Sequence, residues 1–146
     1  MEAGKKFGFR LIRCKELSFE SAPVPGKTIP ADAVSFQYGF RIMPFEKKGV
    51  SLIVTGIIRV DGIQVFKLAS EFVFEITPME GVIELMPDGR LQDHANIVPN
   101  LFGIAYSTLR GMLAVRTAGT PLEKYPLPII DAYDAVKRMQ ASSVSK

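Results

Sequence analysis

The segment that most constrains the fold runs from residue 94 to residue 131 and reads HANIVPNLFGIAYSTLRGMLAVRTAGTPLEKYPLPIID. It predicts one long helix from Pro99 to Thr117, because proline suits a first helical turn, Gly119 suits the stop and Pro121 cannot continue a helix. This helix is apolar on nearly every side, so a single sheet cannot cover it while its back lies in water. We therefore expect a second cover, and for a chain of 146 residues we expect that cover to be another copy of the same protein.

Small side chains recur along this helix at a spacing near four residues, which lets another backbone approach closely. The seam consists of Gly103, Ser107, Gly111 and Ala114 or Val115. It fits either the protein's own sheet or a second copy, and the sequence does not choose between them.

The C-terminal end predicts an extended segment and a second, shorter helix. Residues 125–128 must be extended, because a residue that precedes proline avoids the helical region. Asp131 is expected to cap a short helix that reaches about Met139, with Tyr133 and Val136 pointing inward. Residues 141–146 are expected to fray.

Four segments of alternating or continuous apolar character predict strands. Their bounds are Phe7–Phe19, Val34–Phe45, Val50–Val60 and Ile63–Ile76. The stretch 21–32 is a proline-rich loop, and 77–93 is irregular with a turn signal at Asp88-Gly89. Asp61-Gly62 predicts a two-residue hairpin turn. That turn would pair Ile58 with Val65 and leave apolar groups on both faces, so either a bulge shifts the register or the sheet is covered on both faces.

Length and composition limit the class of protein. A chain of 146 residues predicts one domain over residues 1–146, and a hydrophobic fraction of 47% fits a packed core. No apolar run is long enough for a membrane span, and the N-terminus lacks the apolar region of a signal peptide. The single cysteine, Cys14, fits a cytoplasmic protein. The net charge of +3 is spread along the chain, which argues against a nucleic-acid partner.

The sequence contains few of the residues that catalysis or metal binding requires. His94 is the only histidine and Cys14 the only cysteine, which leaves neither a nucleophile–base pair nor a zinc cluster. No glycine-rich phosphate loop is present, and we expect no cofactor. Glu16 and Glu20 lie about 13 Å apart along a strand, too far for shared acid–base work on one bond. We therefore do not expect an enzyme.

Two regions resemble the SecB family of bacterial export chaperones. The first is RLIRCKELSFESAPVP, residues 10–25, with its Glu-Leu-Ser-Phe-Glu core over 16–20 and the prolines that follow. The second is residues 96–131, with Asn-Ile-Val-Pro before the long helix, Thr-Ala-Gly-Thr-Pro after it, and Leu-Pro-Ile-Ile-Asp-Ala at 127–132. The strands at 34–76 match only as strands.

The resemblance implies an α+β fold, in which a four-stranded antiparallel sheet carries one long and one short C-terminal helix on one face. It also implies a homotetramer, a dimer of dimers with the long helices in the middle. In this family unfolded polypeptides lie in long apolar grooves, and acidic residues of the sheet dock the translocation ATPase SecA. The matching docking positions are Glu16 and Glu20, which alternation places on one strand face, with Glu71 a further candidate. The sequence itself favours reading these carboxylates as ordinary solvated strand residues.

The resemblance therefore favours an ATP-independent holdase, which would serve either general protein export or one dedicated client. Its candidate client-binding side chains are aromatic, and each also fits a plain core: Phe36, Tyr38, Phe40, Phe45, Phe72 and Phe74. Because SecB proteins are acidic and this chain is basic, a basic element of SecA should not be attracted. A SecB-like chaperone dedicated to one client, such as an antitoxin, fits as well as general export.

Two other functions remain open. The chain could be an assembly subunit that binds one folded partner and has no holdase activity. It could also be an enzyme or small-molecule binder, for which Arg41, Arg59 and His94 are the candidate pocket residues. Fold analogy alone cannot rank these functions.

Overall fold

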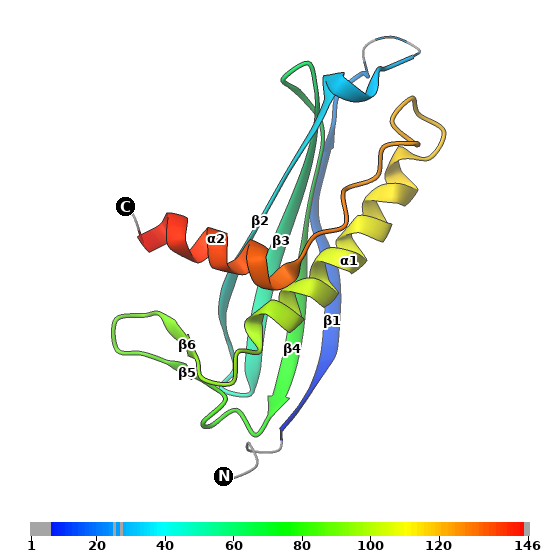
Figure 1. The fold of residues 1–146 in the computed structure, drawn as a ribbon. Coiled ribbons are helices and arrows are strands. Elements are labelled where there is room, and N and C mark those ends of the chain that lie inside the picture. Colours follow the sequence, from blue (N-terminus) through cyan, green and yellow to red (C-terminus); the bar gives the residue numbers. More distant parts are fainter. Residues whose placement is uncertain (1–6, 25, 27, 145–146) are drawn as a thin grey trace.

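A computed structural model describes residues 7–24, 26 and 28–144 (Figure 1). Four long strands form one antiparallel sheet in the order β1-β4-β3-β2. Their bounds are β1 (Gly8–Ser21), β2 (Val34–Phe45), β3 (Gly49–Val60) and β4 (Ile63–Thr77). Two helices, α1 (Val98–Thr117) and α2 (Ala132–Val144), pack against this sheet. The α+β prediction is confirmed, and the four predicted strands differ from the observed ones by at most two residues at either end.

The sheet has a covered face and an open face. Strands β3 and β4 present their even-numbered side chains to the helices, and among these Leu52, Val54, Leu68 and Phe72 are all completely buried. Gly56 lies beneath α1, where an added Cβ would come within 3.0 Å of the side chains of Leu109 and Leu127. Because such a contact is tighter than most Cβ contacts and would force both leucine side chains to shift, Gly56 allows α1 and its following segment to lie close to the sheet.

The open face carries the opposite side chains of the same strands. On β3, and on β4 beyond the bulge near its start, it consists of odd-numbered positions. Most of these are half-buried, but Ser51 and Val73 on this face are buried. Both helices lie on the other side of the sheet (Figure 1). Ile53, Thr55 and Ile57 of β3 are accordingly only half-buried.

The β3–β4 hairpin resolves one of the open alternatives. Asp61 and Gly62 form its two-residue turn with φ of 52° and 80°, as the sequence predicts for this dipeptide. Pairing then slips between Ile58 and Arg59, so that Ile58 lies opposite Phe66 instead of Val65. The bulge therefore places two large apolar side chains together on the covered face.

Strand β1 carries two register shifts against β4, one between Leu11 and Arg13 and one between Glu16 and Ser18. Each shift inserts one extra residue into β1 and moves the following side chains to the opposite face. Glu16 lies opposite Ser70 on the covered face, whereas Glu20 lies opposite Lys67 on the open face. The expectation that Glu16 and Glu20 share one face is therefore wrong, because strict alternation does not survive a bulge between them.

Helix α1 is capped and stopped by identifiable groups. The carboxylate of Asp93 accepts the backbone N–H groups of Ile97 and Val98 at 2.8 and 2.7 Å, which satisfies two otherwise unpaired donors at the helix start. At the other end Gly119 adopts φ of 81°, as predicted for the stop.

The seam of small residues on α1 has more than one neighbour. A Cβ on Gly103 would lie 3.3 Å from the Cβ of Ala132 in α2, so this glycine packs against the second helix of its own chain. A Cβ on Gly111 would meet nothing within 4 Å. Ile104 and Val115 are 41% and 76% exposed, so the described part of the chain leaves one flank of the apolar helix uncovered.

The segment between the helices is extended and held to α1 by its carbonyl groups. Tyr106 donates its hydroxyl to the carbonyl of Pro128 at 2.7 Å, and Arg110 donates Nε to the carbonyl of Leu127 at 2.6 Å. Burial raises the pKa of Tyr106 to about 12, which keeps the hydroxyl protonated as a donor. These bonds fix where α2 begins.

Helix α2 differs from the prediction in two respects. It continues to Val144, so residues 141–144 are helical instead of frayed, while 145–146 lie outside the described residues. Val136 is buried as expected, but Tyr133 is 52% exposed. Because Ala132, Ala135 and Val136 form the inner stripe, Tyr133 lies on the outer side of the helix.

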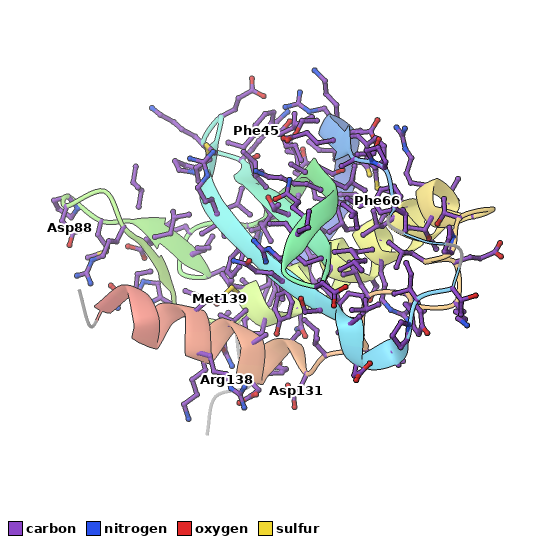
Figure 2. The ribbon with its side chains drawn as sticks, turned by 90° about the horizontal axis from the view of Figure 1, so that it is seen from above. Phe45, Phe66, Asp88, Asp131, Arg138 and Met139 are labelled. Carbon is purple, nitrogen blue, oxygen red and sulfur yellow. The ribbon has the colours of Figure 1, made fainter. Side chains whose placement is uncertain are left out.

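A second, two-stranded sheet was not predicted. Strands β5 (Ile83–Leu85) and β6 (Leu91–Asp93) pair antiparallel within the stretch expected to be irregular. Three residues per strand are too few to show an alternating pattern, although the turn signal at Asp88-Gly89 was correct. Figure 2 shows Asp88 at the tip of this hairpin, beside α2.

Candidate functional site

One unpaired edge of the main sheet carries a row of aromatic side chains. Phe36, Tyr38 and Phe40, called the aromatic row below, lie on the covered face of β2 and are half-buried. The rings of Tyr38 and Tyr106 have centroids 5.2 Å apart, and those of Phe40 and Phe102 are 4.8 Å apart. Among the strands that the structure describes, β2 pairs with β3 alone. Tyr38 and Phe40 therefore rest on α1, and the whole row follows an edge that no other described strand pairs with.

The other three aromatic candidates lie elsewhere. Phe72 and Phe74 are completely buried in the central strand β4, so they belong to the core and are not accessible to a polypeptide bound at the surface. Phe45 lies at the end of β2, where the Arg13 guanidinium is 5.4 Å and the Lys48 ammonium 5.8 Å from its ring centroid. The six predicted client-binding residues thus separate into three at the edge, two in the core and one under two cations.

The three acidic candidates have three different environments. Glu16 accepts both of its hydrogen bonds from Arg116 of α1 at 2.6 Å, and the same guanidinium lies 4.2 Å from the ring of Phe19. Glu20 lies on the open face opposite Lys67. Glu71 lies on the open face of β4. Glu16 is therefore occupied by a contact within its own chain, and the three carboxylates do not form one docking surface.

Glu71 is part of a contact that joins three strands. Ser51 of β3 donates its hydroxyl to Glu71 at 2.7 Å, and Arg13 of β1 donates at 2.8 Å. The Ser51 hydrogen bond, together with the bond and charge of Arg13, holds the pKa of Glu71 below its usual range, although partial burial acts in the opposite direction. The group is an ionised anchor for β1 and makes a poor docking carboxylate, since both of its oxygens already accept hydrogen bonds.

The second unpaired edge, β1, is exposed over nearly its whole length. Of its 14 residues only Phe19 is half-buried, and the remainder are exposed. Apolar side chains nevertheless occur throughout it: Phe9, Leu11, Ile12 and Leu17 are each between 37% and 46% exposed. An edge strand with this much apolar surface is a template for pairing with another chain.

The open face carries cations that its own carboxylates do not neutralise. Arg10 and Arg13 pair with Glu75 and Glu71, but the described residues provide no ion pair for Lys15 or Arg41. Arg59 donates to the neutral side chain of Gln37. A hollow of about 290 Å³ lies among these residues, around Gly39. Its lining is Gln37, Tyr38, Gly39, Phe40, Arg41, Ile53, Thr55 and Ile57.

The structure does not bring together the three residues predicted to line a small-molecule pocket. Arg41 and Arg59 lie on the open face, whereas His94 follows β6 and lies 3.4 Å from Glu84. A cavity of about 730 Å³ lies between the β5–β6 hairpin and α2, and charged, polar and apolar side chains line it, among them Asp93, Asp131 and Asp134. Within the described ranges no group of three or more His, Cys, Asp or Glu side chains is placed to hold a metal ion.

No described helix is long and apolar enough to cross a membrane. In comparisons with known proteins, no family model, no curated protein and no solved structure matches this chain. The SecB resemblance therefore stays a prediction, and a function can be proposed only from the surfaces described above.

Proposed function

We propose that this protein is an ATP-independent holdase that binds unfolded or extended polypeptide in the cytoplasm, as its resemblance to the SecB family implies. The observation that carries the proposal is the aromatic row on the unpaired edge of β2. An extended client can add to this edge as a further strand, with main-chain hydrogen bonds that do not depend on the client's sequence. Its alternate side chains would contact Phe36, Tyr38 and Phe40.

Several features of β2 suit this role. Its 12 residues pair with β3 without a single register shift, so its outer edge is regular up to Pro44, which has no N–H to donate, although β6 also contacts this strand. Aromatic rings that are half-buried already have their orientation fixed by α1, so binding a client costs little side-chain entropy. The edge has one charged residue, Arg41, whose side chain lies on the open face and leaves the aromatic side apolar.

Strand β1 suits a different occupant, a second copy of the chain. Its basic residues Arg10, Arg13 and Lys15 come before its acidic residues Glu16 and Glu20, so two antiparallel copies can place an arginine of one copy opposite a glutamate of the other. In the register that sets Arg10 against Glu20, both side chains lie on the open face, and Lys15 lies opposite the same residue of the second copy. Such pairing would join two sheets into one.

In the same register Leu11 meets Phe19 on the covered face. The uncovered flank of α1, with Ile104 and Val115, offers a second contact for the dimer of dimers that the resemblance implies. The proposed homotetramer would cover both the exposed edge β1 and the exposed helix flank.

Within this proposal a dedicated client fits better than general export. A holdase that serves export would dock a basic element of SecA on carboxylates, but Glu16 and Glu71 already hold arginines of their own chain. The net charge of +3 also opposes such docking. We therefore propose a SecB-like chaperone of one partner, such as an antitoxin, as the more specific form of the function.

The test is suppression of aggregation of a chemically unfolded model protein, without ATP, by the chain and by a Phe36→Ser variant. The wild type should slow light scattering at a few-fold molar excess, and the variant should lose roughly tenfold in potency if about 1.4 kcal/mol of client contact is removed. Leu85→Ser is a matched control, because Leu85 is an apolar strand residue that is 55% exposed outside the aromatic row.

The outcomes separate the proposal from its alternatives. Loss of activity in Phe36→Ser but not in Leu85→Ser supports the aromatic row as the client site. An inactive wild type at several-fold excess would contradict the holdase and favour an assembly subunit. Equal loss in both variants would place the client elsewhere.

A further inference from the structure

We infer that the open face of the sheet is a docking surface for an acidic protein segment, separate from the aromatic row. The proposed occupant presents carboxylates to the cations of the open face and inserts an apolar side chain into the hollow around Gly39. This inference concerns the face that the helices do not cover, and it does not require that the protein be a holdase.

Charge is the first argument. After the pairs Arg10–Glu75 and Arg13–Glu71 are set aside, four cations on the described part of the open face have no ion pair: Lys15, Arg41, Arg59 and Lys67. Lys15 lies opposite Glu71 and Lys67 lies opposite Glu20, and of these two carboxylates only Glu20 is not already paired with an arginine. The face is therefore positive overall, and these cations lie on all four strands.

Register places two of these cations in one row. Arg41 of β2 lies opposite Ile53, Ile53 opposite Glu71, and Glu71 opposite Lys15 of β1. Strands are spaced about 4.8 Å apart, so Arg41 and Lys15 are about 14 Å apart across the sheet. Carboxylates on one extended segment that crosses the strands can reach both.

Shape is the second argument. The hollow of about 290 Å³ adjoins Arg41 and is floored by Ile53, Thr55 and Ile57. A Cβ on Gly39 would meet nothing within 4 Å, so the hollow is open directly above this glycine. An apolar recess beside a cation fits a segment in which apolar and acidic side chains are neighbours.

The mixture of charges favours a protein over other polyanions. Glu20, Glu71 and Glu75 are interspersed with the cations on the same face. A nucleic-acid backbone or an anionic membrane presents negative charge without interruption, so it would meet these carboxylates as well as the cations. A polypeptide can place its carboxylates against the cations and an apolar side chain between them, against the hollow.

The experiment measures binding of a fluorescein-labelled peptide of repeated Asp-Leu-Glu by anisotropy at low and at physiological salt. A peptide of repeated Lys-Leu-Arg, phosphatidylserine vesicles and a single-stranded RNA are tested in parallel. We expect binding of the acidic peptide that weakens as salt rises, and at least roughly tenfold weaker binding for Arg41→Glu, since a charge reversal replaces attraction by repulsion. Lys137→Glu makes the same change in net charge on α2 and should alter binding by less than about twofold.

A second pair of variants tests the hollow. Gly39→Ile fills it with a β-branched side chain that suits a strand, and no described atom blocks its Cβ. We expect roughly fivefold weaker binding, because the apolar side chain of the peptide loses its recess. Ser35→Ile, an exposed position on the same face and strand outside the hollow, should bind as the wild type does.

Four results would overturn the inference. They are no binding of the acidic peptide, equal loss in Arg41→Glu and Lys137→Glu, equal loss in Gly39→Ile and Ser35→Ile, and tighter binding of the vesicles or the RNA than of the peptide. Suppression of aggregation should be unchanged in Arg41→Glu, so failure of this inference and failure of the proposed holdase function would be seen in different measurements.

Discussion

The two edge strands of this sheet, β1 and β2, are held in place by different chemistry. β1 is attached by three ion pairs, Arg10 to Glu75, Arg13 to Glu71 and Glu16 to Arg116, beside the ring contacts of Phe9 with Phe74 and of Phe19 with Phe66. β2 is attached by aromatic packing, with Tyr38 and Phe40 against Phe102 and Tyr106 of α1. Ion pairs are weak where water reaches them, whereas buried aromatic contact does not depend on salt or acid.

Their geometry differs in the same direction. β1 contains two bulges and exposes almost every residue, while β2 pairs regularly with β3 and half-buries its aromatic row. Bulges are one device that limits pairing of an edge with unrelated chains. A second copy of β1 carries the same two bulges and a complementary order of charges, so this edge favours pairing with another β1 over pairing with an unrelated chain. The regular edge of β2 makes no such selection through its backbone, so the choice of client depends on the side chains that contact the aromatic row.

The largest expected effect separates core aromatics from edge aromatics. Phe72→Ala should lower the free energy of unfolding by about 3–5 kcal/mol, because the side chain is completely buried in β4. Phe36→Ala should cost about 1–2 kcal/mol, since half of the transfer free energy is lost without a full cavity. Urea denaturation measures both. Similar costs for the two would mean that the aromatic row is as buried as the core.

Much of this fold follows from local sequence patterns. The strand from Val34 to Phe45 is observed with the predicted bounds, since a half-buried regular edge shows clean alternation. The Asp61-Gly62 turn and the Gly119 stop were equally visible, because each needs a positive φ. In each of these places one local signal determines the structure.

The candidate site was harder to predict, because it depends on register. Nothing in the local sequence of β1 marks Ile12 or Leu17 as bulge residues, yet the shift at Leu17 sends Glu16 and Glu20 to opposite faces. Phe72 and Phe36 have the same alternation, but one lies in the central strand and the other at an edge. Strand order and bulges come from long-range packing, and a single sequence does not report them.

The second prediction tests the proposed role of β1 in self-association. Glu20→Arg should weaken self-association roughly tenfold, because two pairs with Arg10 per dimer would become repulsive and each pair contributes up to about 1 kcal/mol. Arg10→Glu combined with Glu20→Arg should recover part of that loss. Sedimentation velocity over a concentration series measures the dissociation constant. Unchanged association in Glu20→Arg would show that β1 does not pair in this register.

The third prediction concerns the support behind the aromatic row. Tyr106→Phe removes the hydroxyl that bonds to the Pro128 carbonyl at 2.7 Å and should cost about 1 kcal/mol in unfolding free energy. The ring contact with Tyr38 remains, so suppression of aggregation should change little. A large loss of that activity at unchanged stability would mean that the segment between the helices also holds clients.

The smallest expected effect tests whether charge attaches β1. The pKa of Glu71 is lowered from 4.5 in the folded chain, mainly by Ser51 and then by Arg13. A carboxyl with a depressed pKa adds stability at pH above its ordinary value, and that stability is lost as the pH falls through the folded pKa. Glu71→Gln should therefore be less stable than the wild type by about 1 kcal/mol or less at pH 7, and equally stable in acid.

Acid should act on β1 before it acts on β2. Once Glu71 is protonated, its ion pair with Arg13 is lost, whereas the aromatic contacts of β2 are unaffected by pH in this range. Hydrogen exchange measured below pH 4.5 should show β1 amides losing protection first. Ser51→Ala serves as the matched variant, because it removes the main cause of the lowered pKa of Glu71. The pH range over which ionised Glu71 stabilises β1 should therefore be narrower in this variant. Simultaneous loss of protection in both edges would mean that they open as one unit, and the contrast between a charged edge and an aromatic edge would then have no consequence for stability.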